Sequence, residues 1–278
     1  MRIKIVSVLI CIFLLSLPEP GIILTLPGIN VSFRGAENSW AKGEWKELRS
    51  EHFFIYYKNS SRDFLDKLRR QAEDYYRNIT EELGFRRKKF WTWENRAKIY
   101  VFDSHESYIE ETNMASWSSA SVDYRNKIIS TYPDAPELFQ NVLVHELTHI
   151  IFREYVGFSS NIPLWLDEGV ASFMEQKKDA SRIIRGLTAL AKNDSLLNLQ
   201  KLTAISNVLS FPQEKANIFY AQSFGLIYFL VDKFNRDDFA ELCFSLRRGR
   251  TLEKSLYFTY GINGLDELEA QWRKYLLD

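Results

Sequence analysis

Two histidines and a glutamate stand close together near the middle of the chain, in the segment His145-Glu146-Leu147-Thr148-His149. In an α-helix, residues four apart lie on one face, so both imidazoles would point the same way. Such a pair can hold one zinc ion, and the neighbouring carboxylate of Glu146 is then placed to act on a bound water. The chemistry that these residues suggest is hydrolysis by a metal-activated water.

A third ligand is needed, because a catalytic zinc takes three protein ligands and leaves one position for water. One common pattern puts glycine at 152 and histidine at 155, but this chain has Phe152 and Tyr155. The other common solution is a glutamate from a later helix, and Glu168 follows His149 after eighteen residues. That spacing lets one helix end, the chain turn at 159–163, and a second helix return. We predict Glu168 as the third ligand of one zinc ion per chain.

The segment around the two histidines has the pattern of a long helix. Asp134 fits an N-cap, Pro136 falls in the first turn, and Glu137 completes a capping-box pattern. Gly157 is a natural stop. One face of this helix would carry Leu138, Val142, His145, His149 and Phe152. The histidines are therefore predicted to be helical on grounds independent of their own spacing. The alternative is that they are ordinary polar residues on a solvent-exposed helix. The cap, the apolar face and the spacing to Glu168 argue against that alternative.

The elements before this helix predict a small sheet with a backing helix. Strands are expected at 53–57, 97–102 and 127–132, with a hairpin formed by 117–122 and the polar turn 123–126. Apolar residues at helical spacing predict a helix over 59–83, ending near Gly84.

After Pro163 the pattern is almost entirely helical. The predicted helices cover about 163–178, 180–192, 198–207, 215–234, 237–248, 251–260 and 264–277. The predicted fold class is α+β, with an upper lobe over about 48–157 and a helical lower lobe over about 158–278, together forming one domain over 34–278.

Composition bounds the function without naming it. Of 278 residues, 46% are hydrophobic, which is enough for a substantial core. Lys and Arg together number 36, as do Asp and Glu, so the net charge is zero. The chain therefore lacks the excess of positive charge that would suggest a nucleic-acid partner. Apart from Cys11 in the apolar N-terminal run, the chain has one cysteine, Cys243, expected to be buried as a small hydrophobe.

The first 33 residues differ from the rest. Arg2 and Lys4 precede an uncharged run over 5–17, which is short for a membrane span but typical of a signal peptide. A second apolar stretch over 21–31 leaves open an uncut N-terminal membrane anchor. Either alternative predicts an extracytoplasmic protein, secreted or anchored.

The two motifs together resemble a known group. HELTH followed after eighteen residues by WLDEGVA is similar to the gluzincin metallopeptidases, particularly the small peptidase-MA-like families, whose relatives include the large zinc aminopeptidases. The similarity extends over most of the chain from about residue 48. It implies a zincin-like fold with an active-site helix, and a peptide or protein substrate.

The resemblance also implies roles for individual residues. His145, His149 and Glu168 would bind zinc, and Glu146 would act as general base and then as proton donor. A tyrosine from a later helix would steady the oxyanion, and Tyr220 is the best match, with Tyr228 and Tyr155 as competitors.

One element of the aminopeptidases is missing. We find no Gly-x-Met-Glu-Asn-like segment upstream of the histidines, the element that captures the free amine of a substrate in those enzymes. The expected function is therefore a zinc endopeptidase. The alternative is a catalytically silent zinc-binding module that holds a peptide or a cell-surface partner, although metal binding alone does not require Glu146.

Other residues are expected to support the site. Asp167 and Ser172 could hydrogen-bond the ligands, as metal-bound histidines commonly require. An edge strand upstream of the active-site helix could pair with an extended peptide, and 116–121 is the candidate. His52 and His105, adjacent to strand ends, are expected to be structural.

Overall fold

The computed structural model describes residues 44–85, 91, 93–116, 118–158, 160–208 and 210–278, and the backbone of two short strands, β1 (Thr25–Leu26) and β2 (Ile29–Asn30), which pair with each other. The predicted signal peptide or anchor over residues 1–33 lies, apart from these strands, outside the described residues. Within the described part, no helix is both long and apolar enough to cross a membrane.

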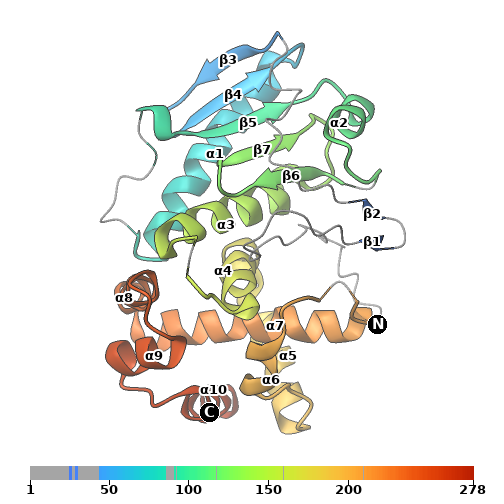
Figure 1. Ribbon diagram of the computed structural model, residues 1–278. Helices are drawn as coiled ribbons and strands as arrows, with labels where there is room; N and C mark the ends of the chain where they lie inside the picture. The colour runs from blue at the N-terminus through green and yellow to red at the C-terminus, as the bar shows by residue number, and fades with distance from the viewer. Residues whose placement is uncertain are drawn as a thin grey trace.

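A five-stranded sheet forms the upper part of the molecule (Figure 1). Its strands, in the spatial order β3-β4-β5-β7-β6, are β3 (Lys46–Arg49), β4 (Phe53–Tyr57), β5 (Ala97–Val101), β7 (Ile128–Thr131) and β6 (Ala120–Asp123). The three central strands are parallel, and β3 and β6 are antiparallel to their neighbours. The central β4 and β5 are largely buried, as parallel strands usually are.

The predicted strands and hairpin are confirmed, with one shift in position. The hairpin formed by β6 and β7 has β6 at the edge of the sheet, but this strand covers 120–123, where 117–122 was predicted for the hairpin and 116–121 for the edge strand. Strand β3 and the short helix α2 (His105–Thr112) were not predicted. Both are short, and α2 begins at a capping box made by Ser104 and Ser107 rather than at an apolar pattern.

Helix α1 (Arg62–Glu82) packs against β4 and against helix α3 (Leu143–Val156). It begins where Ser61 accepts a hydrogen bond from the backbone N–H of Phe64, and its buried residues recur at helical spacing: Leu65, Leu68, Ala72, Tyr76 and Ile79. The helix predicted over 59–83 is thus confirmed. It backs both the sheet and the helix that carries the histidines.

The predicted start of the histidine helix is wrong. Asp134 caps no helix, because residues 132–138 form tight turns in which Ala135 N–H donates to Tyr132 O and Leu138 N–H to Ala135 O. Glu137 has a left-handed backbone (φ 57°) and makes no side-chain cap. A left-handed residue interrupts the continuous right-handed path that a capping box requires.

A π-helical turn, Leu138–Val142, then leads into α3. Its backbone carbonyl at Phe139 accepts a hydrogen bond from the hydroxyl of Tyr75 on α1. This contact joins positions 64 residues apart, so no local sequence pattern could indicate it. The extra residue of a π-turn also shifts the helical face, and α3 is buried on nearly all sides instead of one. Its end at Gly157 (φ 89°) is as predicted.

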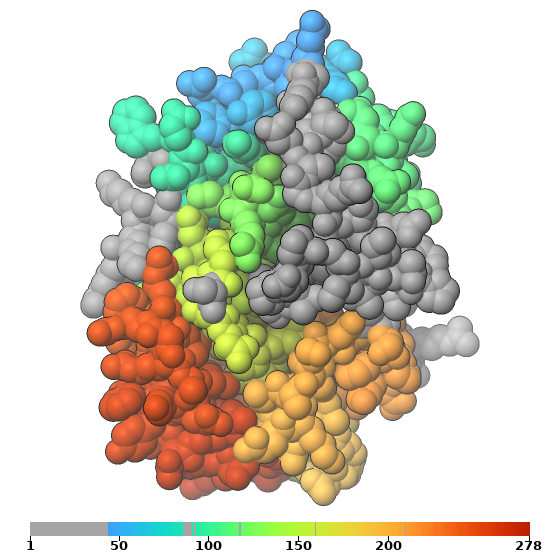
Figure 2. Space-filling view, viewed as in Figure 1, coloured from blue at the N-terminus to red at the C-terminus, as the bar shows by residue number. Residues whose placement is uncertain are grey.

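The remaining helices lie below the sheet and α3 (Figure 1; Figure 2 shows the same arrangement at the surface). They are α4 (Leu164–Gln176), α5 (Ala180–Lys192), α6 (Leu199–Ala204), α7 (Gln213–Phe229), α8 (Arg236–Arg247), α9 (Leu252–Tyr260) and α10 (Leu265–Leu277). The α+β fold class and all seven predicted helices are confirmed. Cys243 is fully buried on α8.

Helices α4 and α7 approach each other closely. A β-carbon added at Gly169 would lie 2.6 Å from the carbonyl oxygen of Ser223, so only glycine fits here without a shift of the backbone. This contact fixes α4 at the residue next to Glu168. Helix α4 also packs against α3, which brings the two predicted ligand segments together.

Candidate metal centre

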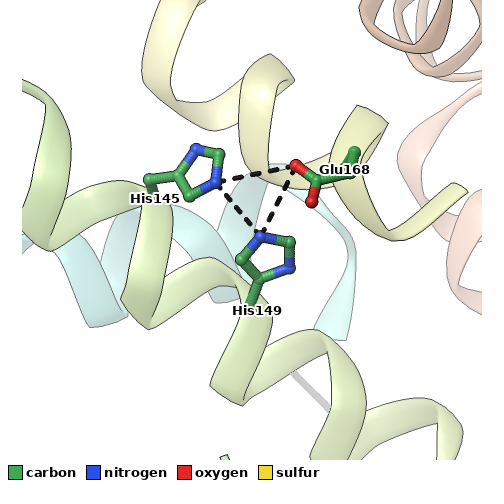
Figure 3. Close-up of side chains that lie close together, drawn as sticks. All are labelled: His145, His149 and Glu168. Carbon is green, nitrogen blue, oxygen red and sulfur yellow. Dashed lines mark hydrogen bonds and ion pairs between the residues drawn. The ribbon is translucent and has the colours of Figure 1, made fainter. Parts of the chain in front are cut away.

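The three predicted ligands converge at the contact between α3 and α4 (Figure 3). The Nε2 atoms of His145 and His149 lie 3.1 Å apart. Oε2 of Glu168 lies 3.8 Å from the first of these nitrogens and 3.9 Å from the second. All three residues are buried, and each offers one ligand atom within 4.8 Å of the others.

These distances fit a single small cation. Atoms that share one tetrahedral zinc ion at about 2.0–2.2 Å lie about 3.3–3.6 Å apart. The three observed separations, 3.1, 3.8 and 3.9 Å, fall on either side of that range. Two imidazole nitrogens and one carboxylate oxygen are also a donor set that zinc accepts. The residues present therefore fit a metal ion of this kind.

Each imidazole is supported from behind by a carboxylate on α4. Nδ1 of His145 lies 2.9 Å from Oε2 of Glu175. Nδ1 of His149 lies 3.0 Å from Oδ1 of Asp167, which confirms the predicted contact of Asp167. An ionised carboxylate can only accept, so each Nδ1 donates and each Nε2 is left to face the centre. This arrangement is the one that a metal ligated through Nε2 requires.

Asp167 has a second partner. Its Oδ2 accepts from Arg153 through Nε at 2.8 Å and through a terminal guanidinium nitrogen at 2.7 Å. Arg153 lies one turn after His149 on α3, and both charged side chains are almost fully buried. Because the guanidinium of Arg153 holds Oδ2 of Asp167, the other carboxylate oxygen is kept in position to accept the hydrogen bond from His149.

The centre carries an excess of buried negative charge. Three carboxylates, Glu146, Asp167 and Glu168, are at most 3% exposed, a fourth, Glu175, is partly buried with 7% of its side chain exposed, and the guanidinium of Arg153 is buried beside Asp167. A cation between the imidazoles would offset this excess, because buried charges need partners.

The pKa values follow from the same charges. Burial lowers the pKa of His145, but the hydrogen bond and charge of Glu175 outweigh burial and raise it to about 10. Burial raises the pKa of Glu168 to about 7, against the opposing effect of the two histidines. Burial also opposes ionisation of Asp167, yet Arg153 and His149 hold its pKa below the usual value. A proton on His145 thus occupies the place that a metal ion would take.

Glu146 is buried beside the ligands, with 2% of its surface exposed. Its Oε2 accepts a hydrogen bond of 3.2 Å from the hydroxyl of Tyr124, in the turn between β6 and β7. The ring of Tyr124 also meets the ring of His149 edge-to-face, with centroids 5.6 Å apart. The sheet therefore contributes a side chain to the centre.

The other predicted residues lie as follows. Tyr220 is half-buried on α7, with its ring edge-to-face to Phe219, and its role stays a prediction. Ser172 is buried on α4, and its contact with a ligand also stays a prediction. His52 is structural as expected, since Nδ1 lies 2.6 Å from Oε2 of Glu73 and the ring stacks on Tyr76. His105 begins α2 and contacts the ring of Tyr132.

Three residues of the centre were not predicted. Glu175 follows Glu168 by seven residues, two helical turns on the same face, and Arg153 follows His149 by four. Both spacings were visible in the sequence. Tyr124 left no such signal, because only the folded hairpin brings it to α3.

A family model of the peptidase MA superfamily matches residues 94–278. The chain therefore belongs to the peptidase MA superfamily, the class of protein that the fold and the centre define together. The matched region contains the two histidines and Glu168. It also contains the other residues of the centre: Tyr124, Glu146, Arg153, Asp167 and Glu175. No curated protein is similar enough in sequence to match.

Proposed function

We propose that this protein is a zinc-dependent endopeptidase that acts outside the cytoplasm. The observation that carries the proposal is the buried Glu146 carboxylate beside a His-His-Glu centre of metal-binding dimensions. A site that only stored a metal would not require a further buried carboxylate at this position, because burying a polar group costs free energy unless it has partners.

The residues divide the chemistry between them. When bound, a zinc ion would polarise the peptide carbonyl and lower the pKa of a water molecule. Glu146 takes a proton from that water as the water attacks the carbonyl carbon, and then passes the proton to the leaving amine nitrogen as the C–N bond breaks. Asp167 and Glu175 hold the imidazoles in place. A tyrosine, for which Tyr220 is the candidate, would donate to the developing oxyanion.

The position of β6 supports a peptide substrate. This strand is at the edge of the sheet, and the residue that directly follows it in the chain, Tyr124, donates a hydrogen bond to Glu146. An extended peptide added along an edge strand is a recurring mode of recognition, and it requires no free terminus. The proposed endopeptidase activity follows from this mode together with the missing amine-binding segment.

The test uses the purified full chain. Zinc content and hydrolysis of peptides with blocked termini are compared for wild type, Glu146→Gln and the control Glu241→Gln, which changes an exposed glutamate on α8. We expect about one zinc ion in all three proteins, and a kcat lower by about 10²–10⁴-fold in Glu146→Gln alone. Wild type without zinc, or equal cleavage by Glu146→Gln, would contradict the proposal.

The same proteins test the catalytically silent alternative. Zinc binding by wild type with no cleavage across broad peptide libraries, and peptide binding retained in Glu146→Gln, would favour a binding module. Mass determination of the mature N-terminus tests the extracytoplasmic location, for which the N-terminal sequence is the support. A mature chain that has lost the apolar segment over 5–17 would indicate a cleaved signal peptide.

A further inference from the structure

Tyr124 projects from a turn whose backbone is well held. The turn joins β6 to β7, and Asp123 accepts from the backbone N–H of Asn126 at 3.0 Å and from its side-chain amide at 2.8 Å. These hydrogen bonds link the two ends of the four-residue turn 123–126. The side chain of Tyr124 therefore starts from a fixed point on the sheet.

From this point Tyr124 makes two contacts on α3 that differ in kind. Its hydroxyl donates to Oε2 of Glu146 at 3.2 Å, and its ring packs edge-to-face on His149 with an interplanar angle of 72°. The ring contact is a packing interaction with a predicted metal ligand. The hydroxyl contact is a hydrogen bond to the predicted base. Removing the hydroxyl oxygen alone would therefore break the contact with Glu146 and leave the ring contact with His149 in place.

The hydrogen bond matters because of the geometry of a glutamate. The last torsion of the side chain is broad, so an unheld carboxylate rotates easily. A donor on Oε2 removes this freedom and selects the direction of Oε1. An ionised carboxylate only accepts, so the phenol is the donor.

We propose that Tyr124 is a positioning residue that orients the carboxylate of Glu146 for proton transfer. The proposal rests on the proposed peptidase function and adds a residue to it. Oε1 of Glu146 receives the proton from the attacking water and releases it to the leaving amine nitrogen. Tyr124 keeps its own proton and its hydrogen bond to Oε2 throughout.

The test compares Tyr124→Phe with Tyr275→Phe in the full chain. The first variant removes the hydroxyl and keeps the ring on His149. The second removes a hydrogen bond of the same chemistry, from Tyr275 to Asp232 at 2.7 Å, on α10 at the far end of the molecule (Figure 1). We expect Tyr124→Phe to lower kcat about 10- to 100-fold with KM within about twofold, and Tyr275→Phe to change neither.

Zinc content is measured on every variant. A kcat within about twofold of wild type in Tyr124→Phe, at full zinc content, would overturn the positioning role while leaving the peptidase function intact. Loss of zinc from Tyr124→Phe would overturn it as well, since the residue would then act through His149. A wild type that holds no zinc and cleaves nothing would instead defeat the peptidase function itself.

A second background shows whether Tyr124 acts through Glu146. In Glu146→Asp the carboxylate is one methylene shorter and loses its reach to the phenol. Tyr124→Phe should then lower kcat by no more than about twofold, because the hydrogen bond is already broken. An equally large effect in both backgrounds would mean that Tyr124 acts independently of Glu146, for example on the oxyanion, and would overturn the proposal.

Discussion

The two histidines of the centre are supported by carboxylates of the same helix in two different ways. Glu175 faces His145 near the edge of the centre, where 11% of the histidine side chain is exposed. Asp167 faces His149 in the interior, where both side chains are 1% exposed, and Arg153 clamps it from the other side. One support is a single hydrogen bond and the other is a buried network.

The difference indicates a division of labour. Burying the Arg153–Asp167 pair costs desolvation, which is repaid only by close pairing, so the His149 side is fixed whether or not a metal is bound. The Glu175 side has no clamp of this kind among the described contacts, and it raises the pKa of His145. We expect changes on the His149 side to affect both folding and metal binding, and changes on the His145 side to affect mainly metal binding.

Asp167→Asn should have the largest effect. It leaves the guanidinium of Arg153 buried without its counter-charge, at a cost on the order of 3–5 kcal/mol in the free energy of unfolding. It also loosens the ring of His149, which should weaken zinc affinity about 10- to 100-fold. Denaturant unfolding and zinc titration measure the two effects. An unchanged unfolding curve would contradict the clamp.

Arg153→Met should come next. The carboxylate of Asp167 is then buried without its guanidinium, and the metal-free protein should lose on the order of 3 kcal/mol. The loss should be smaller in the zinc-loaded protein, because the nearby cation offsets part of the charge. Unfolding with and without added zinc measures this difference. Equal losses in both states would show that the metal and Asp167 are not coupled.

Glu175→Gln is the matched change on the other side. The amide oxygen can still accept from Nδ1 of His145, so the free energy of unfolding should change by only about 1 kcal/mol. Zinc affinity should fall about tenfold, since the amide makes the imidazole a weaker base. A loss of stability as large as that of Asp167→Asn would remove the contrast between the two sides.

The smallest expected effect is the release of protons when zinc binds. The metal-free pKa of His145 is raised to about 10, so at pH 8 this imidazole is protonated and zinc must displace the proton. Glu168, with a pKa of about 7, is mostly ionised at pH 8 and releases little. Calorimetry in buffers of different ionisation enthalpy should show release of about one proton by wild type, and less by Glu175→Gln. No dependence on the buffer would contradict this assignment.

The parts of the fold and of the centre that could be predicted from the sequence are those that local spacing determines. The ligands could be predicted because four-residue spacing fixes two imidazoles on one helix face, and the later helices because each has its own apolar period. The start of α3 could not, since the π-turn is held by Tyr75, which is distant in the sequence. Glu175 and Arg153 stand at helical spacing from Glu168 and His149 in the sequence. Their contacts with His145 and Asp167, however, depend on how α3 packs on α4. The hairpin that carries Tyr124 was predicted, but its packing on α3, which brings Tyr124 to Glu146 and His149, has no local pattern.

The central claim is that His145, His149 and Glu168 hold one zinc ion. The most direct test is anomalous diffraction at the zinc absorption edge from crystals of the full chain. The account predicts a single strong peak within about 2.0–2.2 Å of both Nε2 atoms and of a Glu168 carboxylate oxygen. Crystals grown with zinc that show no peak there, or a peak held by other residues, would contradict it.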